Sequence, residues 1–143
     1  MAKYSLGIGS TVTTSNAACW GMLATADANP RITELVITQG AATVSTYGFG
    51  RAATAGTQTA GIAVLPDNAG DATTGKSTCA VAWSAAPTVP ANYLRRFNLG
   101  GVIGDVAILV FPDGIGVAAA QEMVLWNLAT NSAIINVNVS TIE

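Results

Sequence analysis

The residues with the clearest chemical signature form a string that matches the sequence pattern of a phosphate-binding loop. Residues 70–77 read GDATTGKS and fit the pattern G-x-x-x-x-G-K-[ST] at every position. In a P-loop the backbone N–H groups surround the phosphates, and here Lys76 would reach them while Ser77 would bind magnesium. That chemistry requires a strand that ends at the first glycine and a helix that begins near the lysine. The chain has Pro-Asp-Asn-Ala before the string and alternating residues after it. We therefore interpret the string as a Gly/Thr-rich loop, and we keep nucleotide binding as an alternative.

A second glycine pattern, GFGRAA at residues 48–53, fits the dinucleotide-binding pattern G-x-G-x-x-[GA]. A dinucleotide site needs a helix directly after these glycines, because the helix N-terminus holds the pyrophosphate. The residues that follow, TAGT at 54–57, do not favour a helix. We therefore interpret these glycines as turn residues at the end of a strand.

The acidic residues offer two weak candidate sites. Asp67, Asn68 and Asp71 carry oxygens that calcium could bind, but their spacing does not match an EF-hand loop. Asp105 and Asp113 flank an apolar run and could pair as an acid and a base. Both lie beside a glycine, where aspartate chiefly serves in turns. We predict no catalytic, metal-binding or cofactor-binding residues.

The chain has no histidine, which excludes Ser-His-Asp catalysis, Cys-His catalysis and histidine-ligated metals. Its two cysteines, Cys19 and Cys79, do not form a C-x-x-C motif, so a zinc site or a thioredoxin-like site is excluded. We expect two reduced thiols that behave as small hydrophobic residues, and they could pair only if the fold brings them together. We therefore expect a protein that is not an enzyme.

The composition bounds the class of protein. The chain has 143 residues, 50% of them hydrophobic and 10% charged, with a formal net charge of −2. This length suits one domain with a real core, and the high hydrophobicity excludes a disordered chain. Gly, Pro, Thr and Asn interrupt every long uncharged stretch, so a membrane span is not expected. No stripe of Lys or Arg is present, so nucleic acid is a poor candidate partner.

The low charge also has a consequence for the surface. A free domain ordinarily covers itself with roughly 25–35% charged residues, which this chain cannot supply. Its surface must consist largely of Thr, Ser, Asn and Ala, or other subunits must cover part of it.

Short apolar runs separated by Gly and Pro predict strands rather than helices. The last run alternates most clearly, and no segment sustains a period of 3.6 residues. We expect eight strands, at residues 32–38, 43–49, 78–84, 94–99, 106–111, 115–118, 122–128 and 134–142. Their number and spacing predict an all-β sandwich or barrel, with residues 51–75 as a loop or excursion that could hold one strand at 62–65. Pro112-Asp113-Gly114 is a turn signal that should end one strand.

Two of the expected strands are apolar on both faces, at residues 106–111 and 123–128. Such strands need a partner beyond the core of the sandwich.

A series of packing and turn motifs runs from residue 31 to the C-terminus. These motifs are RI at 31–32, YGFGR at 47–51, APTVPA at 86–91, YLRR at 93–96, IG at 103–104, FPDGI at 111–115 and VLWNL at 124–128. Together they resemble the small structural proteins of tailed bacteriophages. Relatives in that group tend to carry a basic residue at this turn, where this chain has Asp113.

The resemblance implies a jelly-roll β-sandwich over residues 31–143 that decorates or cements a capsid, often as a trimer. The implied partners are the major capsid protein and further copies of the chain. The implied location is the virion, assembled in the host cytoplasm. The alternative of the same fold class is a tail, neck or receptor-binding component similar to an adhesin.

Residues 1–30 lie outside the resemblance and are uncharged from Tyr4 to Ala26. We predict that they form an N-terminal arm that contacts a neighbouring subunit or the capsid. The candidate interface residues are Ile8, Val12, Trp20, Met22 and Leu23 in this segment, with Arg95, Arg96 and Trp126 in the sandwich. Trp126 is an equally good candidate for the core.

Overall fold

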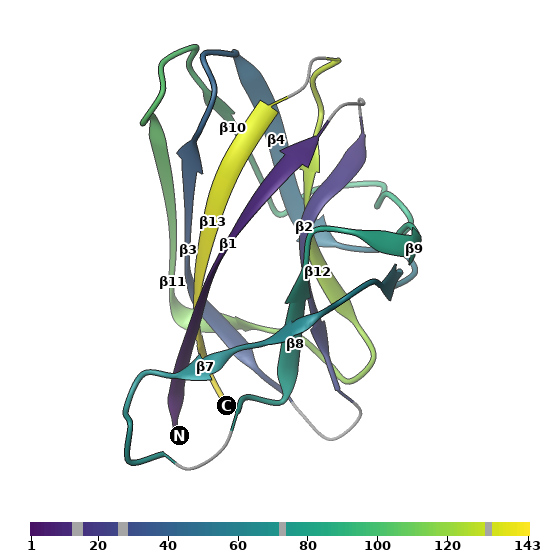
Figure 1. The fold of residues 1–143 in the computed structure, drawn as a ribbon. Helices are drawn as coiled ribbons and strands as arrows, with labels where there is room; N and C mark the ends of the chain where they lie inside the picture. Colours follow the sequence, from purple (N-terminus) through teal and green to yellow (C-terminus); the bar gives the residue numbers. More distant parts are fainter. Residues whose placement is uncertain (13–15, 26–28, 72–73, 131–132) are drawn as a thin grey trace.

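The computed structural model describes residues 1–12, 16–25, 29–71, 74–130 and 133–143, and these residues form an all-β structure. Two antiparallel sheets face each other and enclose the core (Figure 1). The predicted all-β class is confirmed. The strands are more numerous than the eight predicted, because the N-terminal segment forms two strands and the expected loop between residues 51 and 75 forms three short ones.

The first sheet contains five strands, in the spatial order β11 (Val106–Gly116), β3 (Arg31–Gln39), β13 (Ala133–Ile142), β1 (Lys3–Val12) and β7 (Leu65–Pro66). The second sheet contains six, in the order β10 (Arg95–Leu99), β4 (Ser45–Arg51), β12 (Glu122–Asn127), β2 (Ala17–Ala24), β8 (Ser77–Ala80) and β6 (Ile62–Ala63). A separate pair is formed by β5 (Thr57–Gln58) and β9 (Trp83–Ala85).

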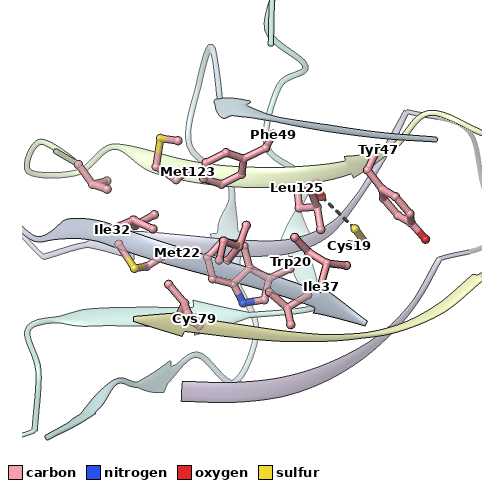
Figure 2. Close-up of a cluster of buried hydrophobic side chains, with 14 of the residues drawn as sticks. Cys19, Trp20, Met22, Ile32, Ile37, Tyr47, Phe49, Cys79, Met123 and Leu125 are labelled. Atoms are coloured by element: carbon pink, nitrogen blue, oxygen red, sulfur yellow. Dashed lines mark hydrogen bonds between the residues drawn. The ribbon is translucent and has the colours of Figure 1, made fainter. Parts of the chain in front are cut away.

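Strand β13 shows how the alternating sequence produces the sandwich. Ile135, Val137 and Val139 are buried in the core, whereas Asn136 and Asn138 are exposed. In a strand, successive side chains point to opposite faces, so this alternation directs one apolar row inward. The buried residues of both sheets meet around Trp20, whose side chain lies within the core cluster (Figure 2).

The prediction that a turn at Pro112-Asp113-Gly114 ends the strand is wrong. Strand β11 continues through it to Gly116, with a shift in register between Val110 and Ile115. At this irregularity β11 has more residues than the paired part of β3. Gly114 has a φ of +68° there, and Arg31 Nη1 donates a hydrogen bond of 2.9 Å to the carbonyl oxygen of Asp113. The separate strand predicted at residues 115–118 is therefore the end of β11.

The N-terminal segment is not an arm outside the sandwich, and this prediction is corrected. Strand β1 pairs with β13 from Lys3 to Val12, and β2 lies between β12 and β8 in the second sheet. Trp20 and Met22 on β2 are fully buried. The physical reason is hydrophobic burial: these large side chains fill the centre of the core, so the segment contributes one strand to each sheet.

Candidate functional site

The outer face of β11 carries an exposed row of large aliphatic side chains. Val106, Ile108 and Val110 are 51%, 59% and 58% exposed. The alternate residues Ala107 and Leu109 pack against the core from the other face of the same strand. The row therefore belongs to the surface of the first sheet, where β11 forms one edge (Figure 1).

Three more exposed aliphatic residues, Val44, Val102 and Ile103, lie in the loops near the start of β11, and each is at least 63% exposed. A hydrogen bond of 2.8 Å from Gly104 N to Gln39 O joins the second loop to the end of β3. A Cβ atom placed on Gly101 would lie 3.4 Å from Val44 Cγ2, so the two loops are adjacent. We call these three residues and the row Val106, Ile108 and Val110 the β11 surface.

The middle of the β11 surface carries no charge. Across the register, Val106 faces Thr38, Ile108 faces Val36, and the acidic Glu34 lies opposite Val110. Apolar patches of this kind on soluble proteins ordinarily mark a site of interaction. The sequence pointed to this strand as apolar on both faces, but none of these six residues was among the predicted site residues.

The second strand predicted to be apolar on both faces, β12, is covered by the chain itself. Its outward side chains Val124 and Trp126 are fully buried. The Tyr93 ring lies against Trp126, with ring centroids 5.7 Å apart. The covering segment, which consists of β5, β9 and the residues next to them up to Tyr93, therefore supplies the cover that a neighbouring subunit was predicted to supply.

A buried carboxylate fastens this covering segment to β12. Glu122 is 1% exposed and accepts three hydrogen bonds: 2.8 Å from Trp83 Nε1, 2.9 Å from Gln58 Nε2 and 2.8 Å from Gly56 N. Gly21 on β2, which pairs with Val124, leaves room for these side chains, because a Cβ there would lie 2.8 Å from both Glu122 Oε1 and Trp83 Cζ2. Each donor comes from the covering segment, so the carboxylate holds this segment against β12.

The string at residues 70–77 lacks the structural context of a P-loop, in which a helix follows the lysine. Ser77 begins strand β8, so no helix follows Lys76. The backbone N–H groups of Lys76 and Ser77 donate to the carboxylate of Glu143, at 2.5 and 3.1 Å. The N–H groups that would bind a phosphate thus already hold an anion of the chain. Residues 72 and 73 of the string lie outside the described part.

The second glycine pattern lies in β4, beneath an aromatic ring. A Cβ on Gly48 would lie 2.6 Å from Tyr93 Cδ1, so the glycine permits the ring to approach the strand. The residues directly after β4 form no helix, and the helix that a dinucleotide site requires is therefore not present after these glycines.

The acidic candidates also have local structural roles. Asn68 Oδ1 accepts a hydrogen bond of 3.1 Å from Gly70 N, and Asp67 accepts one from the Ser5 hydroxyl group. Asp105 precedes β11 and Asp113 lies near its far end, so a length of strand on the order of 20 Å separates them and they cannot act together on one bond. Across the described residues, no group of three or more His, Cys, Asp or Glu side chains is placed to hold a metal ion.

The predicted interface residues have different positions. Trp20 and Met22 are fully buried inside the subunit, so the prediction that they contact another subunit is corrected for these two. Trp126 is also fully buried, which agrees with the alternative that it belongs to the core. Ile8 and Leu23 are half-buried, and the side chain of Val12 lies outside the described part.

The two arginines are exposed on β10, and Gly48 of β4 lies between Arg96 and Trp126 in the register of the second sheet. The Arg95 guanidinium lies 5.6 Å from the centre of the Phe111 ring, and its Nη1 donates to Leu94 O at 2.8 Å. These contacts lie within the subunit, and both side chains still have an exposed surface.

Both cysteines are buried as free thiols. Cys19 Sγ donates a hydrogen bond of 3.1 Å to Leu125 O, whereas Cys79 lies opposite Met22 in the register of β8 and β2 (Figure 2). Burial raises the pKa of the Cys79 thiol to about 12 and raises the pKa of the Cys19 thiol well above its ordinary range. The thiolate forms are disfavoured, so the structure agrees with two unreactive core residues.

A thiol reagent such as DTNB is therefore expected to leave the native protein unmodified at pH 8. The raised pKa values keep both thiols protonated at that pH, and the thiolate is the reactive form. In denaturant both thiols should react, which absorbance at 412 nm would measure as two equivalents. Rapid modification of the native protein would contradict this placement of the cysteines.

Within the described residues, no helix has the length and apolar character needed to span a membrane. The chain was also compared with protein-family models, with curated proteins and with solved structures, and it matches none of them.

Proposed function

We propose that this chain is a structural protein of a bacteriophage virion, a decoration or cement subunit that binds between capsomers and stabilises the head. The observation that carries the proposal is the β11 surface, six exposed aliphatic side chains on a chain with only 10% charged residues. A protein that works against other subunits tolerates such a surface, whereas a free monomer rarely does.

We further propose that the sandwich is a jelly roll, and the strand order supports this. Eight long strands, β1 to β4 and β10 to β13, are numbered here from one to eight along the chain. The first sheet then has the order 1-8-3-6, and the second has the order 2-7-4-5. The strand pairs 1-8 and 3-6 thus lie in the first sheet, and the pairs 2-7 and 4-5 lie in the second. This arrangement is the pattern of a double Greek key. The short strands β5 to β9 are an insertion between the fourth and fifth of these strands.

The proposed role is structural and not enzymatic. The carboxylates that the fold brings into contact with several donors are those of Glu122 and Glu143, and both bind groups of the chain itself. Each of them fastens one segment to another, so the polar interactions support a role in which a rigid surface is presented to a partner.

The partner that we propose is the major capsid protein of a phage head. The test adds the purified chain to heads that lack it and separates bound from free protein by sedimentation. We expect saturable binding at a fixed ratio to the major capsid protein, and heads that withstand a higher temperature. Binding to isolated tails or to host cells, with none to heads, would overturn the capsid role in favour of a tail or adhesin component.

A further inference from the structure

We infer that β11 pairs edge to edge with β11 of a second copy of this chain. The inference rests on the proposed function and deepens it, because it names the contact by which two copies associate, either on the capsid or before they bind to it. In the described part of the chain, β11 has β3 as its only neighbour in the first sheet, so its other edge is open (Figure 1).

The register identifies which backbone groups point to the open edge. Gln39 N donates a hydrogen bond of 2.7 Å to Asp105 O, and the same register places Ala107 opposite Ile37 and Leu109 opposite Leu35. In an antiparallel ladder, alternate residues bond to one neighbour and the residues between them point the other way. The N–H and C=O groups of the row Val106, Ile108 and Val110 therefore face the open edge.

Other edge strands of the two sheets are protected in ways that β11 is not. Strand β10 carries Arg95 and Arg96, β7 consists of Leu65 and Pro66, and β6 has two residues. Charges, proline and short length are the ordinary means by which proteins keep an edge from pairing. From Val106 to Val110 strand β11 has neither a charged residue nor a proline.

The open edge of β11 is complementary to itself. When two copies pair antiparallel with Ile108 opposite Ile108, Val106 of each copy lies opposite Val110 of the other. These are the residues whose N–H and C=O groups point outward, so each pair can exchange two hydrogen bonds. The aliphatic side chains of the two copies then lie side by side on one face, where cross-strand pairs of β-branched residues stabilise a sheet. Because this segment is uncharged, no like charges face each other.

The irregularity after Val110 sets the length of this contact. The register of β11 shifts between Val110 and Ile115, and Pro112 has no N–H group to donate. The paired segment therefore ends before Pro112. Such a contact uses the same residues of both copies and has two-fold symmetry. The trimer that the resemblance implies would require a different contact.

Engineered cysteines test both the contact and its register. The native thiols are buried, so a single new cysteine on β11 is the exposed one. In a hydrogen-bonded pair the Cα atoms are about 5.5 Å apart, which a disulfide can span. Under mild oxidation Ile108→Cys should give a covalent dimer on non-reducing electrophoresis. Val106→Cys, the matched control on the same strand, should remain a monomer, because residue 106 faces residue 110 of the partner. Equal cross-linking of the two variants, or none, would overturn the register.

The mass in solution tests the same contact without a covalent bond. Light scattering should give twice 14.4 kDa for the unmodified chain and 14.4 kDa for Ile108→Lys. The control is Leu65→Lys, at a residue of similar exposure on the opposite edge of the sheet, and it should remain a dimer. A monomeric or trimeric unmodified chain, a dimer that survives Ile108→Lys, or loss of the dimer in Leu65→Lys would overturn the inference. These measurements use the chain without capsids, so their failure is distinct from a failure to bind heads.

Discussion

Removal of residues 1–12 is expected to leave a chain that does not fold. Strand β1 pairs with β13 along its whole length, and the backbone of Ala2 exchanges hydrogen bonds of 3.2 and 3.1 Å with Glu143. Without β1, an edge of β13 and the core beneath Tyr4 would open to water. Domains have a total stability of about 5–15 kcal/mol, and the loss of an interior strand exceeds what that margin tolerates. Circular dichroism and denaturant titration should show no cooperative transition.

The control for this truncation removes only Met1, which is almost fully exposed. That variant should unfold with the same midpoint as the full chain. If a chain of residues 13–143 kept a cooperative transition near the original midpoint, the segment would behave as a dispensable arm and its place in the sheet would be wrong.

Replacement of Glu122 by alanine is expected to lower the free energy of unfolding by about 2–4 kcal/mol, because three half-buried donors would lose the acceptor that they share. The indole N–H of Trp83, the side-chain amide of Gln58 and the backbone N–H of Gly56 would each lose their acceptor. Urea titration measures the change. The tryptophan fluorescence, to which Trp83 contributes together with Trp20 and Trp126, should also shift to longer wavelength as the covering segment loosens.

Two further variants bracket this prediction. Glu122→Gln preserves the shape of the side chain but directs an NH₂ group at a donor, so it should lie between the alanine variant and the unmodified chain. Asp113→Asn changes an exposed carboxylate and should alter stability by less than about 0.5 kcal/mol. A Glu122→Ala variant as stable as Asp113→Asn would mean that the three hydrogen bonds do not hold the segment on β12.

The sequence predicted the all-β class because the alternation in β13 is explicit. The same rule missed β1, although Leu6, Ile8 and Ser10 alternate there with Gly7 and Gly9. Glycine is not a polar residue, so the alternation of apolar residues with glycines was not recognised as the pattern of a strand. The structure explains them: a Cβ on Gly9 would lie 3.1 Å from Asn136 Oδ1 on the neighbouring strand. Strand β2 was missed because the covering segment buries its second face, which removes alternation from the pattern.

The candidate surface was only partly predictable for a related reason. Residues 106–111 and 123–128 were equally apolar on both faces, and local sequence could not distinguish them. The difference arises because β5, β9 and Tyr93 fold over the second sheet, where Tyr93 and Trp83 meet β12. In the described part of the chain, no segment covers the outer row of β11, Val106, Ile108 and Val110. That outcome depends on contacts distant in sequence, which periodicity does not contain.

The most direct test of the proposed virion role is to count copies of the chain in purified particles of a phage whose genome carries its coding sequence. Quantitative mass spectrometry of intact virions, with separated heads and tails measured in parallel, gives this number. The proposed function predicts a fixed, high ratio to the major capsid protein, retained in the head fraction. Purified virions from which the chain is absent would contradict the account.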